Sequence, residues 1–234
     1  MRLDKFLVAT GCCTRSVAKK QVRAGAVLVN GQAVRSSDQN IDENADTVTY
    51  CGAKVVYRKY TYIMLNKPEG YVSATEDTRD PTVLELIPAE ARARGMFPCG
   101  RLDKNTLGLM LLTDNGELAH KLLAPKSHVS KTYRFKSKFP IDEADAKRFE
   151  NGLVLEDGYE TKPAKIELDS TAMGGYITLV EGKYHQIKRM LEALDNKITY
   201  LERVSFGPLT LDGELARGEW RYLSESEIEA LEAH

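Results

Sequence analysis

The sequence predicts an α+β protein with two unequal domains. Segments with strand-like patterns outnumber helical ones and do not alternate strictly with them, which argues against a doubly wound parallel sheet. The 234 residues are enough for two domains. Positive charge is concentrated near the N-terminus. Residues 1–60 carry ten Lys and Arg and five Asp and Glu, a net charge of +5. Residues 61–211 have a net charge of −1 and residues 212–234 a net charge of −5. We therefore expect a small basic domain over residues 1–60 and a larger domain over residues 61–234.

Two helices are expected at the start of the basic domain. Apolar residues at helical spacing indicate a first short helix that Gly11 ends, then a second helix that Thr14 caps and Gly25 ends. Three cations in the second helix repeat at i, i+4 and i+8 and so share one face: Arg15, Lys19 and Arg23. Such a face is typical of a module that binds a polyanion, although a solvated basic helix gives the same pattern.

A β-hairpin is expected next, because Asn30-Gly31 separates two short apolar runs. Residues 47–50 have the pattern of a further strand, and the polar, basic residues 54–59 that of a linker. In the larger domain, strands are expected at residues 61–66, 109–112, 131–138, 166–169, 176–180 and 199–204. Short elements or helices are expected at residues 83–87, 89–95, 117–123, 142–151, 186–194 and, after a cap at Ser224, up to Ala233. Gly174-Gly175 has the composition of a turn.

Composition excludes several classes of protein. The longest apolar runs are about half a dozen residues, far short of the ~18 that a membrane-spanning helix needs. The first residues, MRLDKF, are charged and contain no apolar signal region, which indicates a cytoplasmic protein. The four cysteines lack the C-x₂-C spacing of a zinc site, so reduced thiols and no metal are expected.

Three stretches carry side chains suited to chemistry. In the first, Gly100-Arg101-Leu102-Asp103, a glycine permits a tight turn and places Asp103 in a loop just before an apolar strand. A carboxylate held there beside a cation can stay ionised and act as a nucleophile or a base. A surface Arg–Asp ion pair is the commoner explanation of so short a motif.

The second stretch is basic. Residues 120–138 contain six Lys and Arg, two His and no acid, and Tyr133 interrupts the cations with an aromatic ring. Cations around an aromatic ring fit a nucleic-acid groove with a stacked base. The alternative is an exposed edge strand whose lysines block pairing with another chain.

The third stretch, residues 181–190 (EGKYHQIKRM), places Lys188 in the first turn of a helix. The helix dipole does not favour a cation there, so a nearby anion would explain this lysine. A solvated lysine would explain it as well.

Three segments of the basic domain together resemble the S4 RNA-binding domain: residues 2–7 (RLDKFL), 14–18 (TRSVA) and 25–31 (GAVLVNG). In that family the basic helix face lies against the phosphate backbone of structured RNA, and phosphate contacts position a protein without specifying sequence. The resemblance implies RNA contacts for six residues: Arg2, Lys5, Arg15, Lys19, Lys20 and Arg23.

The larger domain resembles the catalytic domain of the RsuA-type ribosomal RNA pseudouridine synthases. The motifs are residues 66–68 (NKP), 100–103 (GRLD) followed by 106–116 (TLGLMLLTDNG), 131–133 (KTY) and 181–190. An S4-like domain is the usual companion in that family, so the resemblance covers nearly the whole chain. It implies an S4-like module, helices plus a hairpin, followed by a mixed, largely antiparallel catalytic domain.

The resemblance also implies roles for single residues. Asp103 would be the catalytic aspartate, Tyr133 would stack on the target uracil and remove its C5 proton, and Lys188 would pair with Asp103 and keep it ionised. RNA contacts in this domain are implied for Arg101, Lys131 and Lys183. Many relatives have Arg at the position of Lys188, which gives a carboxylate a two-pronged contact that lysine cannot give.

The implied reaction isomerises a uridine of ribosomal RNA to pseudouridine without cofactor or metal. The YHQIK version of the third motif is similar to that of the subgroup acting on uridine 516 of small-subunit 16S rRNA. The expected partner is ribosomal RNA, free or in a ribonucleoprotein assembly intermediate, and we expect a monomer that binds no membrane. Three alternatives remain: a large-subunit 23S rRNA pseudouridine synthase, a non-catalytic S4-type assembly factor in which Asp103 forms a structural ion pair, and an RNA hydrolase. The hydrolase would need a second carboxylate or a metal cluster near Asp103, and no such spacing is visible.

Overall fold

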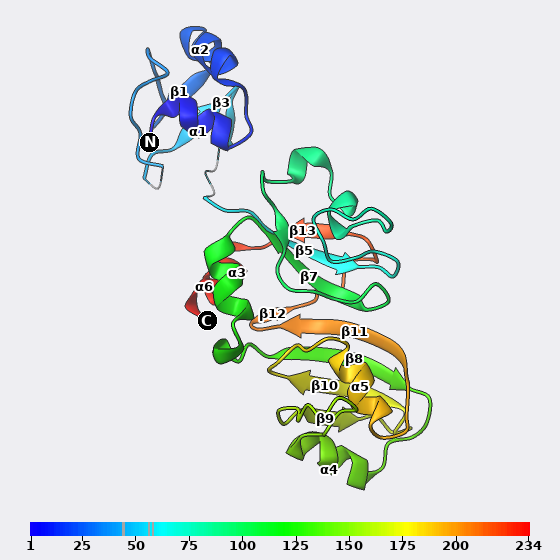
Figure 1. The fold of residues 1–234 in the computed structure, drawn as a ribbon. Helices are drawn as coiled ribbons and strands as arrows, with labels where there is room; N and C mark the ends of the chain where they lie inside the picture. Colours follow the sequence, from blue (N-terminus) through cyan, green and yellow to red (C-terminus); the bar gives the residue numbers. More distant parts are fainter. Residues whose placement is uncertain (44, 56, 58) are drawn as a thin grey trace. The chain divides into compact units, whose positions relative to one another are not determined.

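The computed structural model of the chain describes residues 1–43, 45–55, 57 and 59–234. The described residues divide into two compact units, Met1–Lys59 and Tyr60–His234, each with an apolar core of its own (Figure 1). Both units combine helices with sheets in which antiparallel pairs dominate, so the α+β prediction is confirmed.

The first unit packs two helices against a small antiparallel sheet. Its described elements are α1 (Leu3–Ala9), α2 (Arg15–Arg23), β1 (Val27–Val29), β2 (Gln32–Ala33), β3 (Val48–Tyr50) and β4 (Ala53–Val55), with strand order β2-β1-β3-β4. The Thr14 side chain accepts a hydrogen bond from the Val17 N–H at 3.4 Å and caps α2, as predicted. Asn30 and Gly31 have φ of 52° and 79°, the backbone that a two-residue hairpin turn requires.

Apolar side chains of both helices and of β1 and β3 form the core of this unit: Leu3, Phe6, Leu7, Ala18, Val22, Val27 and Val48. The predicted linker at residues 54–59 is partly wrong, because Ala53–Val55 pairs with β3 as a strand. This strand is short and mostly exposed, so it carries little of the apolar pattern that would reveal it. Val56 and Arg58, which the linker prediction also covered, lie outside the described residues.

The second unit, all of which is described, is built on a nine-stranded mixed sheet with the main order β13-β5-β7-β11-β8-β10-β9. Its strands are β5 (Tyr62–Lys67), β6 (Phe97–Pro98), β7 (Leu107–Thr113), β8 (Lys131–Ser137), β9 (Lys165–Leu168), β10 (Gly174–Leu179), β11 (Ile198–Phe206), β12 (Leu209–Thr210) and β13 (Trp220–Tyr222). Its α-helices are α3 (Gly116–Leu123), α4 (Glu143–Asn151), α5 (Gln186–Glu192) and α6 (Glu225–Ala233), and its 3₁₀ turns are η1 (Val83–Leu86), η2 (Ala89–Ala91) and η3 (Pro125–Ser127).

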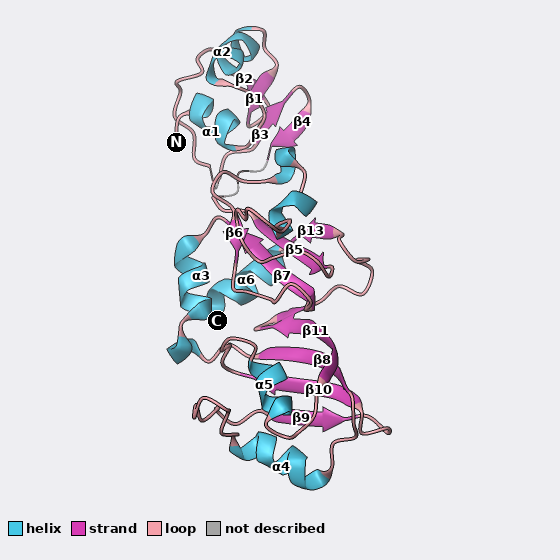
Figure 2. Ribbon diagram, turned by 45° about the vertical axis from the view of Figure 1, so that its right-hand side comes forward, coloured by secondary structure: helices cyan, strands magenta, loops and turns pink. Residues whose placement is uncertain are grey.

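Helices cover both faces of the central sheet (Figure 2). One core combines side chains of α4 and α5 with the sheet, and the other combines those of α3 and α6 with it. Strand β5 serves both, since Ile63 and Leu65 belong to the first core and Tyr62 and Met64 to the second. A strand buried on both faces reads as a continuous apolar run, which explains the sequence YIML. None of the described helices has both the length and the apolar character needed to cross a bilayer.

The parallel pairing of β7 with β11 differs from every other strand pair in this sheet, all of which are antiparallel. The two strands meet where Gly108 lies opposite Arg203. Gly108 has φ of 97°, and a Cβ atom there would lie 2.2 Å from the Arg203 carbonyl oxygen, so only glycine fits. This close approach brings the loop that precedes β7, with Asp103 in it, beside β11 and β8.

Two sequence interpretations are wrong in this unit. Residues 131–138 are not an exposed edge strand, because β8 lies inside the sheet between β11 and β10. Gly174 and Gly175 do not form a turn but begin β10, and the chain turns at residues 169–173 instead. A Cβ atom on Gly175 would lie 1.9 Å from the Glu167 carbonyl oxygen, so close strand approach explains this glycine.

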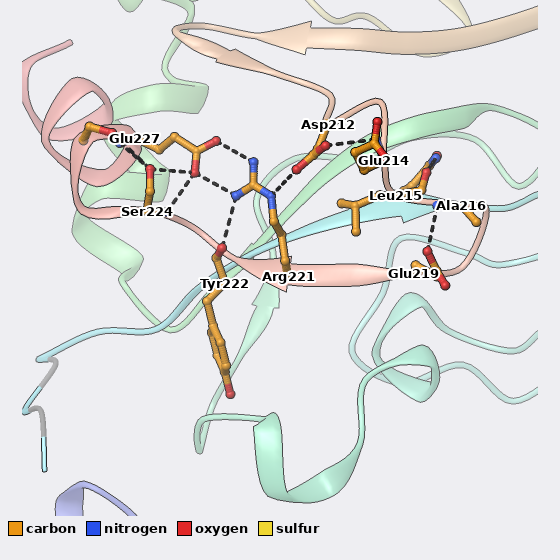
Figure 3. A network of polar contacts seen from close by, with 11 residues as sticks. Asp212, Glu214, Leu215, Ala216, Glu219, Arg221, Tyr222, Ser224 and Glu227 are labelled. Carbon is orange, nitrogen blue, oxygen red and sulfur yellow. Dashed lines mark hydrogen bonds and ion pairs between the residues drawn. The ribbon is translucent and has the colours of Figure 1, made fainter. Parts of the chain in front are cut away.

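The acidic C-terminal segment is tied to the sheet through Arg221 of β13 (Figure 3). The Arg221 guanidinium donates to Asp212 at 2.6 Å and to both carboxylate oxygens of Glu227 at 2.8 Å. These contacts lower the pKa of Glu227 to about 2. Ser224 caps α6 as predicted, in a reciprocal capping box with Glu227.

Candidate active site

A small open pocket of about 70 Å³ lies where the loop before β7 meets β8, β10 and the start of α5. Asp103, Tyr133 and Lys188, which come from three separate sequence motifs, all line it. Arg101 and Lys183 line it as well. Asp103 is its single carboxylate among the described residues. The fold thus brings together the three side chains for which the family resemblance implied catalytic roles.

Asp103 is held in a contact with Lys188. The Lys188 Nζ donates to Asp103 Oδ2 at 2.6 Å, although the two residues are 85 positions apart. His185 Nε2 lies 3.4 Å from the other carboxylate oxygen. The side chains of Asp103 and Lys188 are 28% and 25% exposed, so the pair is shielded from bulk water but open to a ligand. The contact is a charge-assisted hydrogen bond, which is stronger than a bond between neutral groups.

Lys67, at the end of β5, holds the loop that carries Asp103 through hydrogen bonds to the backbone. The Lys67 side chain is fully buried, and its Nζ donates to the carbonyl oxygens of Pro68, Lys104 and Thr106 at 3.1, 3.2 and 2.9 Å. Burial lowers the pKa of Lys67 to about 8, so at neutral pH the three carbonyls still face an ammonium group.

Replacing this lysine should change how stability depends on pH. Between pH 8 and 10.5 the unfolded chain keeps the Lys67 proton that the folded chain has lost, so the cost of burying the charge is relieved as pH rises. The free energy of unfolding of the wild type, measured relative to Lys67→Met in urea, should rise by about 2 kcal/mol between about pH 7.5 and 9.5. A difference that does not change with pH would show that Lys67 titrates normally. Other groups titrate in both proteins, so their contributions cancel in the difference between the two free energies of unfolding.

The loop before α5 is held by buried polar contacts. Glu181 accepts hydrogen bonds from the Lys162 N–H and the Tyr159 hydroxyl, both at 2.9 Å, and from the Gln186 amide. Gln186, 4% exposed, also accepts from the Lys183 N–H at 2.9 Å. His185 has φ of 49°, an uncommon backbone for histidine, and its ring stacks on exposed Tyr184 at 3.9 Å. This rigid loop sets the direction in which His185 and Lys188 face Asp103.

Tyr133 forms one wall of the pocket with only 8% of its surface exposed. Its position on an internal strand fixes the ring, which can stack against a planar base. The Thr106 hydroxyl is also buried at the pocket and has no hydrogen-bond partner. A buried unpaired hydroxyl costs free energy. No three His, Cys, Asp or Glu side chains of the described residues gather as a metal ion would need.

The other residues predicted to contact RNA lie in different parts of the structure. Lys131 does not line the pocket of Asp103 but a neighbouring cavity. In the first unit, a depression is lined by Arg2, Lys5, Arg15 and Lys19, together with Asp4 and Ser16. Arg2 is also paired with Asp4 at 2.8 Å. Lys20 and Arg23 are exposed on α2 but do not line this depression.

Sequence reasoning assigned no role to several residues that the structure brings to the site. Lys67, Thr106 and His185 all stood inside quoted motifs, but no signal showed that the lysine would be buried or that the histidine would face Asp103. Arg203 was not singled out at all, although it is 1% exposed and lies opposite Tyr133 in the sheet. The sequence carries no signal of this burial, because Glu202 precedes Arg203 in the strand and arginine is rarely buried.

Comparison with known families agrees with this geometry. The profile described as RNA pseudouridylate synthase matches residues 61–193, and that of the S4 domain matches residues 1–46. The chain belongs to the RNA pseudouridylate synthase family. It is therefore an isomerase that acts on RNA, and the pocket around Asp103 lies within the matched region.

This pseudouridine synthase has relatives of nearly its own length. It is 45% identical to the Bacillus subtilis protein named "Uncharacterized RNA pseudouridine synthase YtzG", over 99% of this chain and 98% of the relative. It is 39% identical to ribosomal small subunit pseudouridine synthase A of Escherichia coli K12, over 97% and 98% of the two chains. A crystal structure of a pseudouridylate synthase superposes on it with a TM-score of 0.70 at 38% identity, covering 99% of both chains.

Proposed function

We propose that this synthase converts one uridine of small-subunit 16S ribosomal RNA, uridine 516, to pseudouridine. Two observations support the choice of RNA. Relatives that share 37–39% of its residues are named for the small ribosomal subunit. The loop that faces Asp103 also carries the YHQIK sequence that resembles the same subgroup.

The observation that carries the catalytic proposal is the contact between Asp103 and Lys188 at 2.6 Å in a pocket walled by Tyr133. The ionised Asp103 either attacks C1′ of the target nucleotide or removes the C2′ proton, and in both routes the C1′–N1 bond breaks. The freed uracil stays stacked on Tyr133 while it turns. A C5–C1′ bond then forms while the Asp103–C1′ bond breaks or, in the second route, while Asp103 returns its proton to C2′. The C5 proton leaves to the Tyr133 hydroxyl or a water and N1 gains a proton, so the product has the atoms of the substrate.

The target base must leave its stack to reach Asp103, which costs a few kcal/mol. We propose that contacts to the RNA backbone offset this cost. In the catalytic unit these would come from Arg101 and Lys183 at the pocket and from Lys131 nearby. In the first unit they would come from the basic residues of α1 and α2 and their surroundings: Arg2, Lys5, Arg15, Lys19, Lys20 and Arg23. Residues 1–60 would thus form an RNA-docking domain and residues 61–234 the catalytic domain.

The site is complete within one chain, which supports action as a monomer. We place the reaction in the cytoplasm, on ribosomal RNA that is free or partly assembled with ribosomal proteins. No step of the proposed mechanism calls for a cofactor.

Mapping pseudouridines in ribosomal RNA from cells with and without the gene tests the proposal. We expect one position of 16S rRNA, uridine 516, to lose its pseudouridine and to regain it when the wild-type gene, but not an Asp103→Asn copy, is restored. Loss of a pseudouridine only in 23S rRNA would move the substrate to the large subunit. Unchanged modification in both RNAs, with RNA still bound, would favour a non-catalytic assembly factor.

A further inference from the structure

A second, larger cavity adjoins the pocket of Asp103. Its volume is about 490 Å³, compared with about 70 Å³ for the pocket itself. The two share four lining residues: Arg101, Tyr133, Gly182 and Lys183. A cavity of this volume is in the range that holds a ligand of nucleotide size rather than a single ion.

Arg203, a buried cation, lines this cavity. Arg203 is 1% exposed, its Nε donates to the Leu109 carbonyl at 2.8 Å, and its guanidinium lies 5.0 Å from the Phe206 ring centre. Among the described residues, no carboxylate lies within ion-pair distance of it. Buried guanidinium groups stay charged and are normally paired, so this wall is short of one negative charge.

Lys131 lines the same cavity and adds a second positive charge. Its Nζ donates to the Val129 carbonyl at 2.9 Å and lies 5.7 Å from the same Phe206 ring. Burial, with a contribution from the charge of Arg203, lowers the pKa of Lys131 to about 8. Neighbouring Cys99 supplies no anion, because burial raises the pKa of its thiol to about 11. The two cations therefore repel each other in a partly dry site.

Acidic residues in the cavity do not compensate for these charges. Glu181 is the single carboxylate in the described lining, and its oxygens already accept from Tyr159, the Lys162 N–H and Gln186. Three further cations, Arg101, Lys162 and Lys183, line the cavity, together with apolar and aromatic side chains that include Leu122, Leu123, Pro125, Val129, Tyr133 and Tyr159. A lining that combines cations with apolar and aromatic groups suits a nucleotide, because the cations can contact its phosphate and the other groups its base or sugar.

We propose that this cavity binds the nucleotide next to the target uridine in the RNA strand, with its phosphodiester between Lys131 and Arg203. The phosphate supplies the anion that the folded chain lacks, and its position beside Tyr133 orients the strand so that the neighbouring uridine enters the pocket of Asp103. This proposal depends on the proposed function in one respect, namely that the ligand is an RNA strand. It assigns a binding residue, Arg203, and a positioning task to Lys131.

Binding of a fluorescent pentauridylate by Lys131→Met, measured without turnover, tests the proposal. We expect affinity to fall about tenfold, and the slope of log K against log salt to become shallower by about 0.7 between about 50 and 200 mM KCl, as for one lost phosphate contact in a single strand. Lys131→Arg should keep most of the affinity. Lys136→Met is the matched control, because Lys136 lies on the same strand but is exposed on its other face.

Thermal unfolding in the absence of RNA supplies a second readout. Lys131 is half-buried beside the buried Arg203, so removing its repelling charge should leave the unfolding midpoint of Lys131→Met equal to or above that of the wild type. A lower midpoint together with weaker binding would show a structural role and overturn the proposal. So would a wild-type salt slope in Lys131→Met, or equal losses in Lys131→Met and Lys136→Met.

Replacing KCl by potassium phosphate at equal ionic strength distinguishes the sources of the anion. Weak competition is expected, since most of the affinity comes from the strand. Strong competition by inorganic phosphate, lost in Lys131→Met, would show a site for free anions and overturn the assignment to RNA. Pentauridylate binding is measured without any product being formed. A negative result in this experiment can therefore be distinguished from a failure to find the expected pseudouridine in 16S rRNA.

Discussion

Asp103→Asn should lose pseudouridine formation by at least about a thousandfold while its affinity for RNA stays within about twofold of the wild type. The amide has the size and shape of the carboxylate, so the pocket keeps its form. It can neither attack C1′ nor accept a C2′ proton, so both chemical routes stop at the first step. Release of tritium from RNA labelled at uridine C5 measures turnover, and filter binding of the same RNA measures affinity.

Asp80→Asn is the matched control for this variant. Asp80 forms an exposed ion pair with Lys104, the residue that follows Asp103, at 2.5 Å. Exposed ion pairs contribute little, so tritium release by Asp80→Asn should be unchanged. Turnover above about a tenth of the wild-type rate in Asp103→Asn would remove Asp103 from the chemistry and leave its contact with Lys188 as a structural ion pair.

Much of the fold could be predicted because its signals are local. The cap at Thr14, the hairpin at Asn30-Gly31 and the capping box at Ser224 are each set by a few neighbouring residues, and the structure has all three. Gly174-Gly175 could not be interpreted in this way. Glycine serves turns and close strand contacts alike, and only the approach of β9 decides between them.

The candidate site could also be predicted only in part. A cation in the first turn of a helix suggested an anion near Lys188, but a solvated lysine fitted the pattern as well, and the helix could not show which carboxylate lies beside it. That answer needs the parallel contact of β7 with β11, made at Gly108. Burial of Lys67 and Arg203 was beyond sequence reasoning, because a charged residue in a strand is placed inside or outside by its distant neighbours.

Removing the cation from the Asp103 pair should be the second largest effect, and three variants separate its causes. Lys188→Met should lower turnover about a hundredfold, because Asp103 loses the charge-assisted hydrogen bond of 2.6 Å that holds its carboxylate in place. Lys188→Arg should stay within about tenfold of the wild type, because a guanidinium supplies the same charge and an additional donor. Single-turnover tritium release at saturating RNA isolates the chemical step from binding.

Arg189→Met is the control for a lost cation on α5. Arg189 follows Lys188 directly and pairs with Asp157, whose side chain is 58% exposed, so this variant removes the same charge from the same helix but not from Asp103. We expect its single-turnover rate to match that of the wild type. Equal losses in Lys188→Met and Arg189→Met would mean that positive charge near the RNA, and not the contact with Asp103, sets the rate. Since His185 lies 3.4 Å from the other Asp103 oxygen, the residual activity of Lys188→Met should fall further in the double variant with His185→Ala.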